Sequence, residues 1–217
     1  MDNLLQIMDL SGTQWLTVII VALIVGFSKT GIGGVTVLAI PILASVFGGK
    51  DSTGIMLPML LVGDLFAVWY YRKSVEWKKV FLPLPWALLG VILGVVVGSY
   101  ISDKTFLALI GIIILICLGI LLYTQMKGKD FKVPEEAWFY ALIGVLSGFA
   151  SMIGNAAGPI FGVYLLALGF KKNNFMGTNA WFFFIINLTK LPLQIFVWHN
   201  IGIRSVTITA VVIPLIT

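Results

Sequence analysis

Long apolar segments alternate with short polar ones along the chain, and this pattern predicts a bundle of hydrophobic helices. The apolar segments are Trp15–Phe27, Val35–Phe47, Ile55–Tyr71, Val80–Ile101, Phe106–Tyr123, Trp138–Ile153, Ile160–Phe170, Ala180–Trp198 and Val206–Thr217. A membrane-spanning helix needs about 20 apolar residues, within a range of about 17–25. The segments that reach this length are Ile55–Tyr71, Val80–Ile101, Phe106–Tyr123 and Ala180–Trp198. We therefore predict an all-α polytopic membrane protein.

Two of the remaining segments, Val35–Phe47 and Ile160–Phe170, are short, and each follows a glycine-rich break. Unwound backbone is tolerated in a membrane only where it is buried in protein or lines a watery cavity. The free N–H groups at a helix start favour anions. We therefore predict two broken helices, with short half-helices after the breaks, whose N–H groups face an anion near the middle of the bilayer.

Composition agrees with a membrane protein and excludes a soluble domain. Hydrophobic residues make up 59% of the 217 residues and charged residues only 11%, against about 25% charged residues in soluble domains. The net charge of +5 does not indicate nucleic-acid binding, because most lysines and arginines lie in short clusters between apolar segments. Cys117 is the only cysteine, so we expect no disulfide, no metal site and no cofactor.

The two breaks belong to segments that resemble each other, which predicts an internal repeat. Gly31 matches Gly154, and Asp64 matches Asn187. We divide the chain into a first transmembrane repeat (1–125), a basic and acidic cytoplasmic linker (126–137) and a second transmembrane repeat (138–217). The second repeat ends within the counterpart of the segment that starts at Val80, so we expect it to be incomplete at its C-terminus.

Basic clusters predict the orientation in the membrane. One cluster comprises Arg72, Lys73, Lys78 and Lys79, and the other comprises Lys127, Lys129 and Lys132. Two apolar segments separate the clusters, so both are expected on the cytoplasmic side. The repeats are inverted if the short segments cross fully and parallel if those segments are re-entrant. The charge distribution favours inverted repeats.

The glycine motifs and the duplicated layout resemble a known family. The first motif is Gly26-Phe27-x3-Gly31-x-Gly33-Gly34-x6-Pro41, and its weaker echo is Gly148-Phe149-x4-Gly154-x3-Gly158-Pro159. Both resemble the TauE/SafE family, also called the sulfite exporter or TSUP family, and the resemblance covers essentially the whole chain. It implies an inner-membrane, multi-pass permease for small anions of sulfur or organosulfur metabolism.

The first break supplies candidate substrate-binding residues. They are Lys29, Thr30, Gly31, Gly33 and Gly34. The Lys29 ammonium and the glycine N–H groups would contact an anion at the positive end of the following half-helix. The alternative for Lys29 is a side chain that snorkels to the interface.

The second break supplies Gly154, Asn155 and Gly158. The Asn155 amide can donate a hydrogen bond to an oxyanion, and Gly158 permits close backbone approach. The alternative for Asn155 is capping of the helix that begins at Pro159, since Asn and Pro are favoured at helix starts.

A third group of polar residues lies in the segment Ala180–Trp198. Asn187, Lys190 and Gln194 are three and four residues apart and therefore share one helix face, which we expect to point into the protein. Asn187 and Lys190 are candidate substrate ligands, with Lys190 as the second cation. The alternatives for Lys190 are a structural contact to Asp64 or snorkelling.

Asp64 is the only acidic residue deep in an apolar segment. Three roles are open for it: an ion pair with Lys29 or Lys190, a proton carrier that couples transport, or a helix-packing contact. A carboxylate beside an anion path repels the substrate unless it is protonated or paired, so proton coupling through Asp64 is a hypothesis.

These observations predict a secondary transporter of a small sulfur-containing oxyanion, of the sulfite or organosulfonate class. A passive small-anion channel is the alternative. No arrangement of residues supports an enzyme. The expected partners are the small anion and the lipid bilayer, without nucleic acid. The anion, the transport direction, the coupling ion and the oligomeric state, including a homo-oligomer, are left open.

Overall fold

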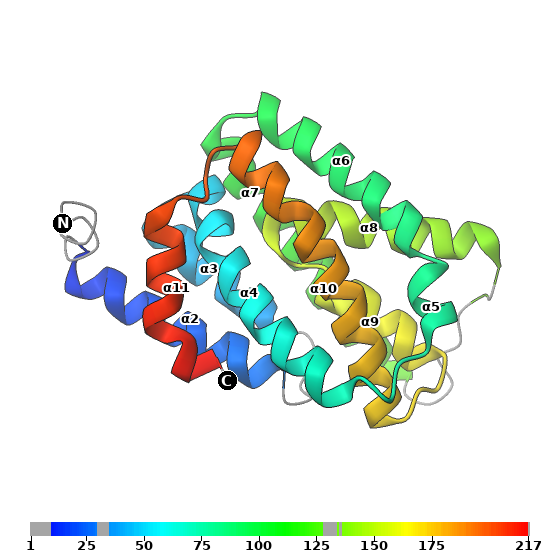
Figure 1. Ribbon diagram of the computed structural model, residues 1–217. Coiled ribbons are helices and arrows are strands. Elements are labelled where there is room, and N and C mark those ends of the chain that lie inside the picture. Colours follow the sequence, from blue (N-terminus) through cyan, green and yellow to red (C-terminus); the bar gives the residue numbers. More distant parts are fainter. Residues whose placement is uncertain (1–9, 30–34, 128–133, 135, 217) are drawn as a thin grey trace.

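The computed structural model describes residues 10–29, 35–127, 134 and 136–216, and the regular elements in these ranges are α-helices (Figure 1). The helices are α2 (Gly12–Ser28), α3 (Thr36–Phe47), α4 (Gly49–Tyr71), α5 (Trp77–Phe81), α6 (Leu84–Tyr100), α7 (Asp103–Lys127), α8 (Ala137–Gly154), α9 (Gly158–Ala167), α10 (Lys172–Phe196) and α11 (Ile203–Ile216). The predicted all-α fold class is confirmed, and each apolar segment falls on a helix. The predicted repeat and the division of the chain remain predictions.

In the part of the chain that the structure describes, four helices are long and apolar enough to cross a membrane. They are Gly49–Tyr71, Trp77–Tyr100, Asp103–Thr124 and Ala137–Gly154. This set differs from the prediction, because it contains α8 and lacks the segment Ala180–Trp198. Helix α10 is 25 residues long, but its asparagines, Lys190 and Gln194 lower its hydropathy. Together these helices make the chain a multi-pass membrane protein.

The described helices on either side of each break fold back on each other as a helical hairpin. Gln14 near the start of α2 and Phe47 at the end of α3 border one pocket, whereas Lys29 and Thr36 at the other ends of these helices border another. Helices α2 and α3 therefore run antiparallel.

Helices α8 and α9 form the second hairpin. The Tyr140 ring near the start of α8 lies 6.0 Å from the Tyr164 ring near the end of α9, so these helices also fold back on each other.

The two hairpins enter the bundle from opposite ends. Asn200, which borders the same pocket as Gln14, donates a 2.7 Å hydrogen bond to the Lys50 carbonyl at the start of α4. At the far end, Tyr140 of the second hairpin lies 3.5 Å from the ammonium of Lys79, shortly after α4. The 23 residues of α4 separate these ends by about 35 Å, from the rise of an α-helix.

Helices α4 and α10 cross through the middle of the molecule (Figure 1). Glu76 N–H donates to the Thr178 hydroxyl, and Asn200 donates to the Thr53 hydroxyl. The start of α10 therefore lies beside the end of α4, and the end of α10 lies beside the start of α4, so the two helices are antiparallel.

Small residues bring α6 and α8 into close contact. A Cβ atom at Gly148 would collide with the Ala87 carbonyl, and one at Gly90 would collide with the Val145 carbonyl. Small residues at regular spacing permit this close approach of two helices.

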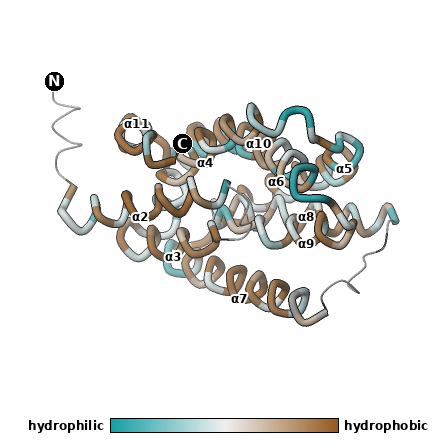
Figure 2. The backbone as a smooth tube through the Cα atoms, turned by 90° about the horizontal axis from the view of Figure 1, so that it is seen from below, coloured by the Kyte–Doolittle hydropathy of each residue, from teal (hydrophilic) through white to brown (hydrophobic). Residues whose placement is uncertain are grey.

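Helix α7 presents an apolar face to the surroundings. Figure 2 shows it as hydrophobic along its length, at the margin of the bundle. Ile112, Leu115 and Ile116 are 55%, 69% and 55% exposed. Such a surface suits lipid contact.

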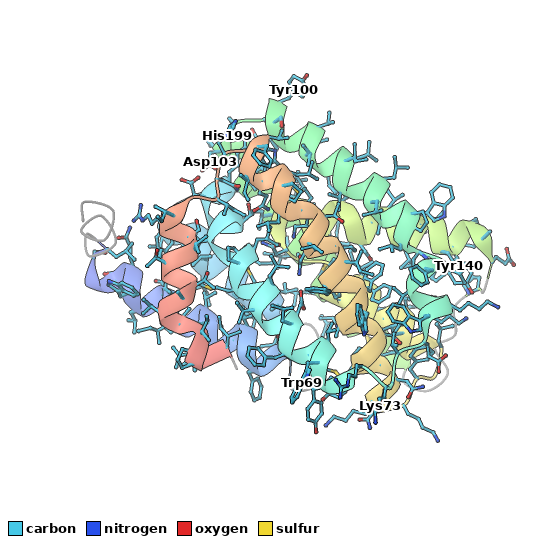
Figure 3. All side chains as sticks on the ribbon, in the orientation of Figure 1. Trp69, Lys73, Tyr100, Asp103, Tyr140 and His199 are labelled. Atoms are coloured by element: carbon cyan, nitrogen blue, oxygen red, sulfur yellow. The ribbon has the colours of Figure 1, made fainter. Side chains whose placement is uncertain are left out.

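One cluster of basic residues lies at one end of the molecule, whereas Lys50 and Arg204 lie at the opposite end, near Asp103 and His199. Lys73 lies at the end opposite Tyr100, Asp103 and His199 (Figure 3). Lys172 borders the same pocket as Tyr70 and Tyr71 and therefore belongs to the Lys73 end. We call this the basic end.

Candidate functional site

A cavity of about 50 Å³ lies where the tips of the two hairpins approach each other. Its polar lining comes from both hairpins and from α10: Ser28, Lys29, Thr36, Ser151, Asn155, Gly158, Asn179 and Asn187. A cavity that holds a water needs roughly 10–15 Å³ by this measure. The space therefore suits a few waters or one small ion.

Part of the predicted site lies outside the described residues. Thr30, Gly31, Gly33 and Gly34 belong to this part. Lys29 and Thr36, which flank the segment, both line the cavity.

Lys29 forms an ion pair with Asp64 of α4. The Lys29 Nζ lies 2.5 Å from the Asp64 Oδ1, and the Asp64 side chain is fully buried while that of Lys29 is 20% exposed. Lys29 therefore reaches into the protein rather than snorkelling to an interface. Of the three roles open for Asp64, the structure bears out the ion pair with Lys29.

Asn187 of α10 completes the environment of Asp64. Its amide Nδ2 donates to the second carboxylate oxygen of Asp64 at 2.7 Å. Both oxygens of a buried carboxylate thus have a donor, which is the condition under which burial of a charge is tolerated.

Lys190 is surrounded by neutral oxygen atoms. Its ammonium donates to the Ser151 carbonyl at 2.8 Å and the Ser151 hydroxyl at 3.1 Å. It also donates to the Asn155 Oδ1 and to the Asn187 Oδ1 at 3.2 Å. The alternative of snorkelling is wrong, because the Lys190 side chain is completely buried. Asn187 joins Lys190 to Asp64, without a direct hydrogen bond between the two.

Lys190 lies behind the cavity wall rather than on it. The three residues that accept its hydrogen bonds line the cavity, whereas Lys190 is not among the lining residues described. Its charge therefore acts through a layer of Ser151, Asn155 and Asn187. The prediction that Asn187, Lys190 and Gln194 point into the protein is confirmed, with exposures of 3%, 0% and 0%.

Asn155 holds an unpartnered hydrogen-bond donor at the cavity. It terminates α8 in the left-handed conformation, with φ of 51°, which Asn adopts more readily than most residues. Its Oδ1 accepts from Lys190, while its buried Nδ2 has no hydrogen-bond partner among the described residues. The expected capping of the next helix is wrong, because Ala157 is the N-cap of α9 and makes no side-chain bond.

Two short helices begin at the cavity. Thr36 is the first residue of α3 and Gly158 the first of α9, and both line the cavity. The free N–H groups and the partial positive charge of a helix start favour a bound anion. Gly154, the last residue of α8, is not among the described lining residues.

Other lining residues had weaker signals in the sequence. Asn179, Phe183 and Asn187 recur every four residues on α10, which places them on one helix face. Ser151 lies in the second break and is bonded to Lys190. The apolar lining, which includes Phe175 and Met176, cannot be separated from ordinary core residues by sequence.

A larger cavity of about 520 Å³ adjoins the first and shares Lys29 and Ala67 with it. It extends to Tyr71 and Lys172 at the basic end. On the other side of Asn155, a gap bordered by Thr53 and Met56 has no room for water.

Comparison with known proteins supplies one match. Residues 18–217 match the family described as Sulfite exporter TauE/SafE. Comparisons with curated proteins and with solved structures found no match. The family is one of membrane transporters and not of enzymes. Because the match covers nearly the whole chain, the protein belongs to the TauE/SafE sulfite exporter family.

Proposed function

We propose that this protein is a secondary transporter of a small sulfur-containing oxyanion, of the sulfite or organosulfonate class, in the inner (plasma) membrane. The observation that carries the proposal is the unpartnered Asn155 Nδ2 at a cavity where two helices begin. Free N–H groups at helix starts and an unpartnered amide beside them suit an anion with several oxygen atoms. Family membership supports anion transport in general.

The hairpins support a transport mechanism with alternating access. They enter from opposite ends of the bundle, and their tips border one cavity. Broken helices around a central site are typical of secondary transporters, which rock one repeat against the other. Asp64 and Asn187, which match in the predicted repeats, meet where antiparallel α4 and α10 cross, as inverted repeats would require.

The cavities favour a carrier over the alternative of a passive channel. The site shares Lys29 and Ala67 with a wide cavity at the basic end, whereas the gap on the opposite side has no room for water. A carrier opens its site to one side of the membrane at a time, which fits this arrangement. A channel needs a continuous polar path across the membrane. The predicted cytoplasmic location of the basic end makes this an inward-open state.

The proposed proton coupling uses Asp64. Protonation of its carboxylate would remove the ion pair with Lys29 and free the ammonium for the substrate. Transport by an Asp64→Asn protein under a proton gradient tests this step. Unchanged coupling in the variant would contradict it.

The test of the proposed function is an uptake screen with purified protein in liposomes. The anions are sulfite, thiosulfate, sulfate, sulfoacetate and taurine, and saturable uptake of at least one is expected. Lys190→Gln should lower the affinity, because Asn155 loses the donor that orients it. Lys104→Gln, which removes an exposed lysine, is the matched control and should transport normally.

A second variant tests the first break. Gly33→Val should block uptake, because a side chain at this position would prevent the close backbone approach to the anion that the sequence predicts. Wild-type uptake by both Lys190→Gln and Gly33→Val would contradict the site assignment, and the absence of uptake for all anions would contradict the function.

A further inference from the structure

We infer that the site selects monovalent over divalent anions and that Asp64 sets this selectivity. The inference rests on the proposed function, in which the cavity binds the transported anion. It concerns the net charge of the buried groups around the cavity.

Three ionisable side chains belong to this cluster, Lys29, Asp64 and Lys190, and the net charges given below are those of their ionised forms. Lys29 and Asp64 cancel in the ion pair, and Lys190 has only neutral oxygens as direct partners. Lys29 is the one ionisable residue among the described lining residues. The sequence of residues 30–34 contains no ionisable side chain. The cluster therefore carries a net charge of +1.

The four contacts of Lys190 match its charged form. Each partner atom is an oxygen that accepts a hydrogen bond, and an ammonium offers three N–H donors and no acceptor. No carboxylate accepts a hydrogen bond from the Lys190 ammonium, and Asp64 is reached only through Asn187. The charge acts on an anion through Ser151, Asn155 and Asn187.

A monovalent anion brings the cluster to neutrality. A divalent anion leaves one uncompensated negative charge among largely buried side chains, and burial of an unpaired charge is costly. The site should therefore prefer a sulfonate or a hydrogen oxyanion to a dianion of the same shape.

Asp64 influences the preference for monovalent anions through its charge, although it is not among the described residues that line the cavity. It neutralises Lys29 from behind at 2.5 Å and is held in place by Asn187 at 2.7 Å. Its role is that of a specificity-determining residue. Without its charge the cluster would carry +2 and would suit a dianion.

The test compares methanesulfonate with sulfate, which are similar in shape and differ by one charge at neutral pH. Binding of each is measured by calorimetry on the purified full chain in detergent. The wild type should bind methanesulfonate more tightly. In Asp64→Asn the affinity ratio should move toward sulfate by about 10-fold or more, from the Coulomb energy of one added charge at short range. The apolar lining is unchanged in the variant, so the shift isolates charge.

Two further variants test whether the affinity ratio follows the net charge and not a structural effect of Asp64→Asn alone. Lys29→Gln gives a net charge of zero, and its ratio should move in the opposite direction, toward methanesulfonate. The double variant Lys29→Gln/Asp64→Asn restores +1 and should return to the wild-type ratio.

The outcomes separate the two proposals. Equal wild-type affinities for the two anions, or ratios that do not follow the net charge, overturn the inference while the proposed function stands. If the wild type neither binds these anions nor transports any anion of the uptake screen, the proposed function fails and the inference with it.

Discussion

Asp64 of α4 and Asn187 of α10 meet at the crossing of two antiparallel helices, with a hydrogen bond of 2.7 Å between the amide nitrogen and the carboxylate. This contact joins two sets of polar residues. Lys29 lies on one side of it, bonded to Asp64, and Lys190 lies on the other, bonded to Asn187. A continuous series of hydrogen bonds thus links the end of the first hairpin helix with Asn155 at the tip of the second.

The ion pair between Lys29 and Asp64 should contribute to stability as a unit. Lys29→Gln leaves a buried carboxylate, and Asp64→Asn leaves a cation. Each single variant should lose about 2 kcal/mol or more, below the roughly 3–5 kcal/mol of a fully buried pair, because Lys29 keeps 20% exposure. Thermal unfolding in detergent measures the effect.

The double variant Lys29→Gln/Asp64→Asn is the control for this prediction. It leaves no unpaired charge, so its loss should be smaller than the sum of the two single losses. Strict additivity would show that the two side chains do not interact.

Packing of α6 on α8 depends on the absence of a side chain at Gly148. Gly148→Ala places a Cβ against the Ala87 carbonyl and should destabilise the protein by about 1–3 kcal/mol, as overpacking does. The midpoint of thermal unfolding reports the change.

Gly119→Ala in α7 is the matched substitution, since no atom lies within 4 Å of the added Cβ. It should be neutral or slightly stabilising, because Ala is a better helix former than Gly by roughly 0.5–1 kcal/mol. Equal effects at Gly148 and Gly119 would contradict the close packing of α6 and α8.

Much of the fold follows from the hydrophobic pattern. The segment Val35–Phe47 predicts α3 to within one residue of its observed start. The spacing of Asn187, Lys190 and Gln194 correctly predicts a buried polar face. Both results depend on local periodicity, which a single sequence contains.

The partners of the buried charges could not be predicted in the same way. From the sequence, either Lys29 or Lys190 could form the ion pair with Asp64. The pair with Lys29 depends on where the first hairpin places Lys29 relative to α4, which a single sequence does not contain. Ser151 and Asn155 reach Lys190 from 39 and 35 residues away. Asparagine is favoured both before a helix start and after a helix end, so the sequence left open whether Asn155 caps the following helix. In the structure it ends α8.

Orientation in the membrane is testable by cysteine labelling. Cys117 is the only cysteine and is buried, so a Cys117→Ala background is suitable. Tyr100→Cys replaces a residue that is 87% exposed, at the end opposite Lys73 (Figure 3). A membrane-impermeant maleimide should label Tyr100→Cys in intact cells.

Lys73→Cys should react with the same reagent only after the cells are permeabilised, because the basic end is expected in the cytoplasm. The reverse pattern would place the basic end outside and would turn the proposed inward-open state into an outward-open one.

The central claim is that the Asn155 amide at the tip of the second hairpin binds the transported anion. The most direct measurement is binding and liposome uptake of the best anion of the screen by Asn155→Gly. Glycine keeps the left-handed backbone and removes the donor, so affinity should fall by roughly 10-fold to 100-fold, the value of a hydrogen bond to a charged group. His199→Gly is the control, because His199 has the same φ of 51° and lies at the far end from Lys73. The account predicts loss of binding in Asn155→Gly alone, and wild-type binding and uptake by a folded Asn155→Gly protein would contradict it.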